Sequence, residues 1–357
     1  MLGLIRPEGV ILAILMIVAI VYANGIKRSK VVVMYALVII GVLGSIYFFW
    51  RWSYFGYPLP NPFYKKGGGH LYFDSLRESI VYAGWLTLPF SIPYLLSFRS
   101  WKLAAKSVFA LIPIGGFVMI WVLLSNEMNF FARFQYAILP IVLMSWPPLV
   151  KGVNLNCCGK TAFFGSPRKR AKPVLLAVLS MVVLIVLSYQ PLVVSSRESV
   201  HSDGRYDVAI MLSDYKDRGY TIATSEAGLL PFYSKWKAVD CWGLNDQWIA
   251  HHGGITKEYL DRYKPEIIMF HARFSPLVPP KGDSVRDPWF NMILVLLNYS
   301  QTNGYVLAAV YGVSPSDTHY YYVNPRFAES SEVISRIRSI DYVWWATGER
   351  CQNWALH

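Results

Sequence analysis

The chain has 357 residues, of which 54% are hydrophobic and 16% are charged, and its formal net charge is +12. A mean hydropathy of +0.32 indicates more apolar surface than one soluble core of this length can bury, which excludes an ordinary soluble globular protein. The basic residues are concentrated in short segments between apolar runs. Membrane topology therefore explains the charge better than a nucleic-acid partner does.

Apolar runs of roughly 20 residues can cross the hydrocarbon core of a bilayer. The loops after the first, third and fifth candidate runs are basic and contain no Asp or Glu, so the positive-inside rule places these loops in the cytoplasm. The pattern predicts a multi-pass protein of the cell membrane with both chain ends outside. The candidate spans are 8–24, 31–50, 79–98, 103–125, 134–150 and 173–194.

A first span that enters the membrane from the outside normally requires a signal sequence or preceding helices, so we expect further helices upstream of Met1. The alternative is an ordinary protein whose amino terminus lies outside. The composition shifts after residue 194. We expect a transmembrane helical domain at 1–194, an exit linker at 195–206 and a small extracytoplasmic α/β domain at 207–357.

Helical and strand periodicities alternate in the last region. This alternation predicts an α/β sandwich with a largely parallel sheet, after a mainly α-helical polytopic membrane domain of about six spans. The predicted helices are 207–218, 256–263, 288–302 and 330–339, and the predicted strands are 220–224, 236–239, 266–271, 305–311 and 319–323.

The outer domain offers no recognisable metal-site spacing. Asn245 and Asp246 fit turn or helix-capping roles better than metal binding. No ligand role is assigned to the group formed by Asp240, Asn245, Asp246, His251 and His252. A disulfide between Cys241 and Cys351 and two free thiols are equally compatible with the sequence.

The predicted outer loop at 51–70 is dense in aromatic, proline and basic residues. Its prolines favour an extended backbone, its cations can hold a lipid-linked phosphate, and its tyrosines can stack on a sugar ring. The alternative is a membrane-interface belt of aromatic side chains with snorkelling cations.

The order of residues in this loop carries more information than its composition. The string RWSYFGYPLPNPFYKK, residues 51–66, closely resembles the R-x-x-Y-x-G-x-x-L-P-N-x-x-Y-x-K signature of bacterial polytopic glycosyltransferases of the GT-C superfamily, which include arabinofuranosyl- and mannosyltransferases. Further segments resemble that family in the expected order: RPEG at 6–9, FARF at 131–134 with Leu139-Pro140, AGLLPFYS at 227–234 and VDCWGLND at 239–246.

The resemblance implies that a sugar is transferred from a polyprenyl-phosphate donor to a cell-envelope glycan, glycolipid or protein at the outer face of the membrane. The family's catalytic carboxylate lies in a loop before the segment that Arg6 opens, so no catalytic residue is assigned here, and an amino-terminal half or partner subunit is expected. A divalent metal ion is the cofactor that the resemblance allows. The residues that it implies for donor binding are Arg51, Tyr54, Asn61, Tyr64, Lys65, Lys66 and Arg133.

A second hypothesis is a non-catalytic membrane subunit whose outer α/β domain binds a glycan or a protein. A transporter fits less well, because the candidate spans hold almost no ionisable residues in their central turns.

Overall fold

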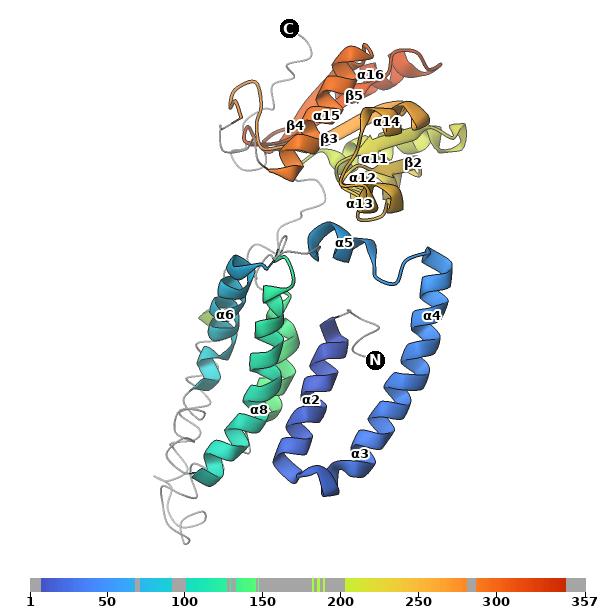
Figure 1. Ribbon diagram of the computed structural model, residues 1–357. Coiled ribbons are helices and arrows are strands. Elements are labelled where there is room, and N and C mark those ends of the chain that lie inside the picture. The colour runs from blue at the N-terminus through green and yellow to red at the C-terminus, as the bar shows by residue number, and fades with distance from the viewer. Residues whose placement is uncertain are drawn as a thin grey trace. The chain divides into compact units, whose positions relative to one another are not determined.

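A computed structural model describes residues 8–67, 71–91, 101–126, 129, 133–145, 147, 182, 185–186, 189, 203–280 and 287–344 of the chain. The chain forms two compact units (Figure 1). The helical unit comprises Met1–Leu59 and Lys66–Val194, and the α/β unit comprises Pro60–Lys65 and Ser195–His357.

The helical unit is built around α2 and α8, whose apolar side chains form its core. Leu12 of α2 is buried with Ala110, Ile114 and Phe117 of α8 and with Ile138. The helices of this unit are α2 (Glu8–Asn24), α3 (Ile26–Val38), α4 (Gly44–Phe55), α6 (Phe73–Thr87) and α8 (Trp101–Met119), and a π-helical turn at Ile39–Leu43 makes α3 and α4 continuous.

Among the described residues, one helix is long and apolar enough to cross a membrane. It runs over 30 residues, Ile26–Phe55, and none of its apolar 18-residue window is buried. The other apolar helices, Glu8–Asn24, Val108–Val122 and Gln135–Ser145, are shorter, with 10–17 residues. The prediction of a six-span membrane domain is therefore wrong.

Two candidate spans show the difference between apolar content and helix length. The candidate at 8–24 coincides with α2, which ends at Gly25 (φ 77°) and, with 17 residues, is shorter than the roughly 20 that cross a bilayer. The candidate at 79–98 starts inside α6, which gives way at Leu88 to a 3-10 turn that contains a proline. Of the candidate at 173–194, four residues are described: Val182, Ile185, Val186 and Tyr189.

The α/β unit contains a five-stranded sheet in the order β2-β1-β3-β5-β4. β1 is parallel to β2 and β3, while β5 is antiparallel to β3 and β4, so the prediction of a largely parallel sheet is wrong. Two residues separate β4 from β5, and such a short connection joins antiparallel strands. The strands are β1 (Thr221–Thr224), β2 (Lys237–Asp240), β3 (Ile267–Ala272), β4 (Val306–Ser314) and β5 (Asp317–Val323).

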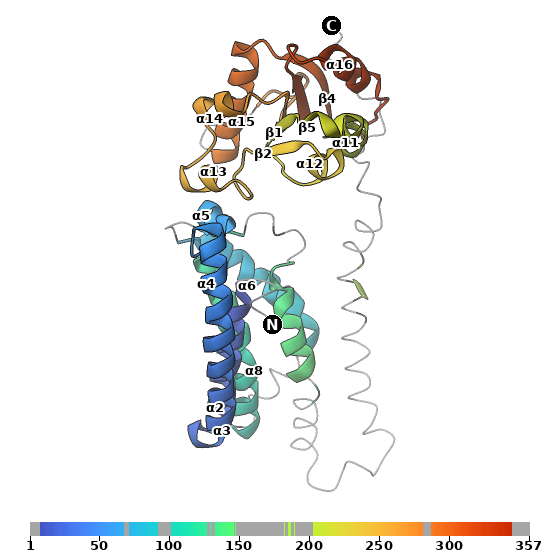
Figure 2. The same ribbon diagram turned by 90° about the vertical axis from the view of Figure 1, so that its right-hand side faces the viewer.

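Helices cover both faces of this sheet, which gives three layers (Figure 2). Side chains alternate along a strand, so Ile267 and Met269 pack on one face and Ile268 and Phe270 on the other. The first face packs against α11 (Arg205–Leu212), α12 (Leu229–Ser234) and α16 (Ser330–Ser339). The second packs against α13 (Gln247–His251), α14 (Lys257–Tyr263) and α15 (Pro288–Thr302).

Side-chain caps fix where three of these helices begin. The backbone amides of Ile249, Tyr259 and Trp289 donate to Asp246, Thr256 and Asp287, respectively. Asp287 is followed by a proline at the first helical position, where the missing amide hydrogen costs nothing.

Candidate metal centre

The candidate site, a cluster of carboxylate and imidazole side chains, lies at the carboxyl ends of β1 and β3. The chain leaves β1 toward β2 on one side and later returns to β3 on the other side, so the strand order reverses between β1 and β3. Ligands of open α/β sheets bind at such a reversal, outside the carboxyl ends of the strands. Glu226 follows β1, and His271 lies near the end of β3.

His271 and His319 are direct cross-strand neighbours in the β3–β5 register. Their rings stack with centroids 4.6 Å apart and an angle of 23° between the planes. Because β5 is antiparallel to β3, its first residues lie beside the last residues of β3. Asp317, which opens β5, is therefore also close to His271.

The turn after β1 brings Glu226 to the two imidazoles. The Thr224 hydroxyl accepts a hydrogen bond from the Glu226 amide at 3.1 Å. The Ser225 hydroxyl accepts one from the His271 amide at 2.8 Å, which ties the turn to β3. The Ser225 amide donates to the carbonyl of Met269 at 3.1 Å. These hydrogen bonds hold the backbone of the turn in place without any contribution from the Glu226 side chain.

Carboxylates lie at both ring nitrogens of His271. Nδ1 is 2.8 Å from Glu226 Oε1, and Nε2 is 2.5 Å from Asp317 Oδ1. The hydrogen bond from His271 holds the pKa of Asp317 below its usual value, against the opposing effect of burial. The indole of Trp289 donates to the His271 carbonyl at 3.0 Å, so the ring is positioned from its backbone as well.

His319 is the most unusual member of the cluster. Its side chain is 2% exposed, and neither ring nitrogen has a hydrogen-bond partner among the described residues. Its Nε2 is 3.6 Å from Glu226 Oε2. Burial, reinforced by the positive charge of Arg205, holds the pKa of His319 well below the usual histidine value. One donor atom each from Glu226, His271 and His319 lies within 4.8 Å of the others, close enough to hold a metal ion together.

Arg205, the first residue of α11, borders the cluster. Its Nη1 pairs with Glu226 Oε2, and its Nε and Nη2 donate to Asp203 Oδ2 at 2.8 and 2.5 Å. Asp203 is buried, which by itself would raise the pKa of its carboxyl, but the hydrogen bonds and charge of Arg205 outweigh burial and lower it.

The residues predicted for donor binding fall in both units. In the helical unit, Arg51 of α4 donates to the Pro58 carbonyl at 3.1 Å, and Tyr54 is exposed and stacked on Trp50. Arg133 is exposed, with its guanidinium 5.2 Å from the centre of the Phe134 ring.

A short helix, α5 (Asn61–Gly67), contains the remaining predicted donor residues, Asn61, Tyr64, Lys65 and Lys66. The expectation of an extended backbone here is wrong, because Pro62 occupies the first turn, where a helix tolerates proline. Asn61, Tyr64 and Lys65 belong to the α/β unit, and Lys66 belongs to the helical unit.

Within the α/β unit, two of these residues contact the segment after β2. The ring centre of Tyr64 is 4.2 Å from that of His251. Lys65 Nζ is 4.4 Å from the centre of the Trp242 ring, in a cation–π contact. None of the predicted donor residues is among the metal-ligand candidates.

Asp240, the last residue of β2, and Asp246, which caps α13, have structural roles, as the sequence predicts for Asp246. Asp240 accepts hydrogen bonds from the backbone amides of Trp242, Gly243 and Asn245, and burial nevertheless raises the pKa of its carboxyl.

Burial also raises the pKa of the neighbouring Cys241 thiol far above its usual value. Cys351, which the sequence leaves open as either a disulfide partner of Cys241 or a free thiol, lies outside the described residues.

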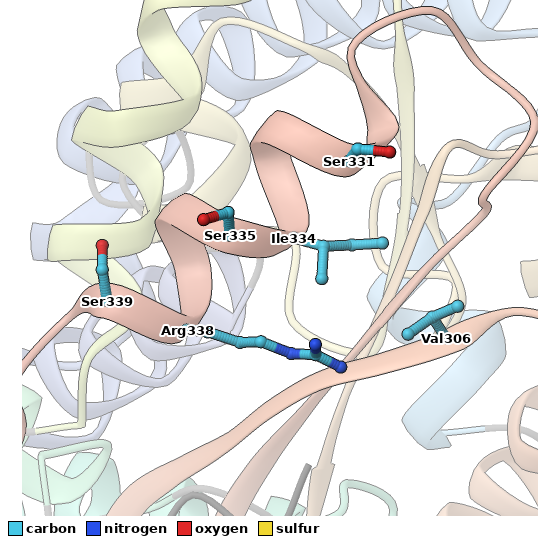
Figure 3. A pocket seen from close by; sticks show the side chains of 6 residues that line it. All are labelled: Val306, Ser331, Ile334, Ser335, Arg338 and Ser339. Atoms are coloured by element: carbon cyan, nitrogen blue, oxygen red, sulfur yellow. The ribbon is translucent and has the colours of Figure 1, made fainter. Parts of the chain in front are cut away.

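A separate hollow lies between α16 and β4 (Figure 3). Its charged lining residue, Arg338, donates through Nη2 to the Leu307 carbonyl at 3.1 Å. The lining contains no histidine or carboxylate, so this hollow lacks the groups for metal or acid–base chemistry. It is lined by Val306, Ser331, Ile334, Ser335, Arg338 and Ser339.

Sequence reasoning did not assign Glu226, His271 or His319. Glu226 and His271 are 45 residues apart, so no short motif contains both. One signal was available: both positions fall at the carboxyl ends of predicted strands, and such ends share one edge when the strands are parallel. The contribution of His319 depends on antiparallel pairing, which the sequence analysis did not predict.

The model of a family described as a domain of unknown function (DUF8728) matches residues 196–327. No curated protein and no solved structure matches the chain. The matched segment contains the whole candidate metal centre, namely Glu226, His271 and His319 with Asp203, Arg205 and Asp317.

Proposed function

We propose that the α/β domain binds a divalent transition-metal ion through Glu226, His271 and His319. The observation that carries the proposal is the buried His319, whose nitrogens have no hydrogen-bond partner among the described residues although Glu226 and His271 are adjacent. Burying an imidazole without polar partners is unfavourable. A metal ion bound to one nitrogen would supply the missing interaction.

The donor set indicates the class of ion. Two imidazoles and one carboxylate are typical ligands of catalytic zinc sites, in which a fourth position stays open to water or substrate. Calcium and magnesium favour oxygen ligands instead. Such an ion acts as a Lewis acid on a bound oxygen. The Asp317 carboxylate fits the supporting role of holding a ligand imidazole by its other nitrogen.

Calorimetry with zinc on the purified full chain in detergent, after chelator treatment, tests this proposal. We expect one zinc site per chain that His319→Ala removes. His252→Ala is the matched control, because His252 is exposed and bonded through Nδ1 to the Trp248 carbonyl. The proposal fails if the wild-type chain binds no zinc, or if His319→Ala binds it as well as the wild type does.

A second candidate function is sugar transfer from a polyprenyl-phosphate donor to a cell-envelope glycan, glycolipid or protein at a membrane. It is supported by the order of the GT-C-like segments and by one specific contact. Tyr64 and Lys65 of the signature pack on His251 and Trp242, respectively, and Trp242 belongs to another segment that the resemblance names. An ammonium group and aromatic rings suit a phosphate and a sugar, respectively.

The bilayer is the partner that this second function requires, and Ile26–Phe55 is the candidate anchor. Lys27, Arg28 and Lys30 mark the end of this helix that we propose faces the cytoplasm. The rival hypothesis is a non-catalytic membrane subunit that binds a glycan or a protein through its α/β domain.

An assay with labelled polyprenyl-phosphate sugars, in membranes that contain the full chain, separates these hypotheses. Transfer that Lys65→Ala reduces by tenfold or more, and that Lys216→Ala leaves unchanged, supports the enzyme. Lys216 is an exposed residue elsewhere in the α/β unit. If the chain shows neither transfer nor donor binding, the enzyme hypothesis fails and the hypothesis of a non-catalytic subunit remains.

A further inference from the structure

A cation of the protein itself already occupies one of the proposed metal ligands. The Arg205 guanidinium pairs with Glu226 Oε2, the carboxylate oxygen that faces His319 Nε2 at 3.6 Å. A metal ion held between Glu226 and His319 would need this same oxygen. The guanidinium and the ion would therefore compete for one ligand atom.

The charges around the cluster favour a divalent ion over the arginine alone. The carboxylates of Asp203, Glu226 and Asp317 carry three negative charges, and Arg205 carries one positive charge. Together these four side chains carry a net charge of −2, which a divalent ion would neutralise. A second cation near Arg205 is nevertheless repelled by it.

Asp203 provides the guanidinium with an alternative partner. It accepts hydrogen bonds from Nε and Nη2 of Arg205 through Oδ2, and from the Arg205 amide at 3.0 Å through Oδ1. Asp203 is 3% exposed. The arginine can thus lose its contact with Glu226 while its charge stays paired.

We infer that Arg205 is a built-in competitor for the metal: it holds Glu226 in the metal-free protein and must release this carboxylate when the ion binds. The inference rests on the proposed metal site and concerns its regulation. The metal-free domain keeps Glu226 paired, and the metal concentration at which the site fills is set by the strength of the Arg205–Glu226 pair. Losing the competitor leaves Glu226 without that partner, which favours the metal-bound state.

Zinc affinities of variants of the full chain, measured by calorimetry in detergent, test the inference. Arg205→Met, which removes the cation but keeps much of the side-chain bulk, is expected to bind zinc about tenfold more tightly or better. Arg205→Lys keeps the charge and should stay within a fewfold of wild type. Arg218→Met is the matched control, because Arg218 pairs at 3.0 Å with Glu329 and not with a metal-ligand candidate.

Asp203→Asn gives an independent measurement in case Arg205→Met does not fold. It removes the competing partner of the guanidinium and a nearby negative charge, so zinc affinity should fall severalfold. Unchanged or weaker binding by a folded Arg205→Met, or tighter binding by Asp203→Asn, overturns the inference while leaving the metal site standing. Absence of zinc binding from the wild type and from Arg205→Met alike means that the proposed function itself has failed.

Discussion

At the scale of single residues, the proposed metal binding depends on two neighbouring histidines, His271 and His319. Both are direct register partners, yet their surroundings differ, because His271 contacts carboxylates at both nitrogens and His319 is buried without hydrogen bonds among the described residues. The carboxylates orient the His271 ring without the help of a metal ion. His319 has nitrogen lone-pair capacity that the described protein groups do not use.

Asp317 should tune the metal site without being a ligand. Its carboxylate fixes the ring of His271 through Nε2, which leaves Nδ1 toward Glu226. We predict that Asp317→Asn weakens zinc affinity by about 10–100-fold and keeps one site per chain. Competition with a chromophoric chelator measures this change. Asp214→Asn, which alters an ion pair with Arg336 elsewhere, should bind zinc like the wild type; an equal affinity for Asp317→Asn would contradict the assigned role.

Tyr220 contributes to the loss of stability of the α/β domain at alkaline pH, together with buried tyrosines such as Tyr299, whose pKa burial raises to about 12. The Tyr220 hydroxyl donates to the Glu329 carboxylate, and this bond raises the pKa of Tyr220 to about 12 from an ordinary value of 10.0. The folded state therefore holds the proton more tightly than the unfolded state does. The associated stability is complete below about pH 10 and is lost as the pH rises toward 12.

Tyr220→Phe should reduce this alkaline loss of stability, because the variant lacks one of the phenolic protons that are released on unfolding. Thermal unfolding followed by circular dichroism at about pH 9 and 12 compares the two proteins, and a phenolate absorbance titration locates the missing group. An equal alkaline loss in both proteins would show that Tyr220 does not contribute to it.

At the scale of elements, the β4–β5 hairpin controls two residues of the site. Gly312 lies in β4 opposite Thr318, where a Cβ atom would overlap the Asp317 carbonyl and would approach Thr318 Cα within 2.7 Å. Neither contact can be relieved by rotating a side chain. The strand that presents Asp317 and His319 would have to shift.

Gly312→Ala should therefore lower both the stability of the domain and its zinc affinity. Forcing an extra methyl group into such a position typically costs about 1–3 kcal/mol. Gly254→Ala is the control, because a Cβ there meets no atom within 4 Å and the backbone φ is not positive. Thermal unfolding and zinc calorimetry of both variants test this expectation, and wild-type behaviour of Gly312→Ala would refute the packing argument.

At the scale of the whole molecule, the sequence predicted the α/β unit far better than the helical unit. The predicted strands at 220–224 and 266–271 correspond to β1 and β3, and the predicted helix at 288–302 corresponds to α15. The two strands are short runs of mainly apolar or β-branched residues, and α15 begins at a capping aspartate followed by a proline. The short helices α12 and α13, of six and five residues, do not span enough turns to produce a periodic pattern.

The errors have a common physical origin, which is that local composition does not encode how segments meet. Apolar content predicted six spans; the candidate at 8–24 matches α2, but α6 ends at Thr87, inside the candidate at 79–98. The metal centre depends on a pairing between strands that begin 50 residues apart, at Ile267 and Asp317. The predicted donor residues were placed by motif order, and their binding role stays a prediction.

X-ray absorption spectroscopy of the zinc-loaded full chain can show whether Glu226, His271 and His319 bind one metal ion together. We expect nitrogen and oxygen ligands at about 2.0–2.2 Å with the scattering of two imidazoles, and the loss of one imidazole in His319→Ala. Zinc bound through sulfur, or without imidazole, would contradict this expectation.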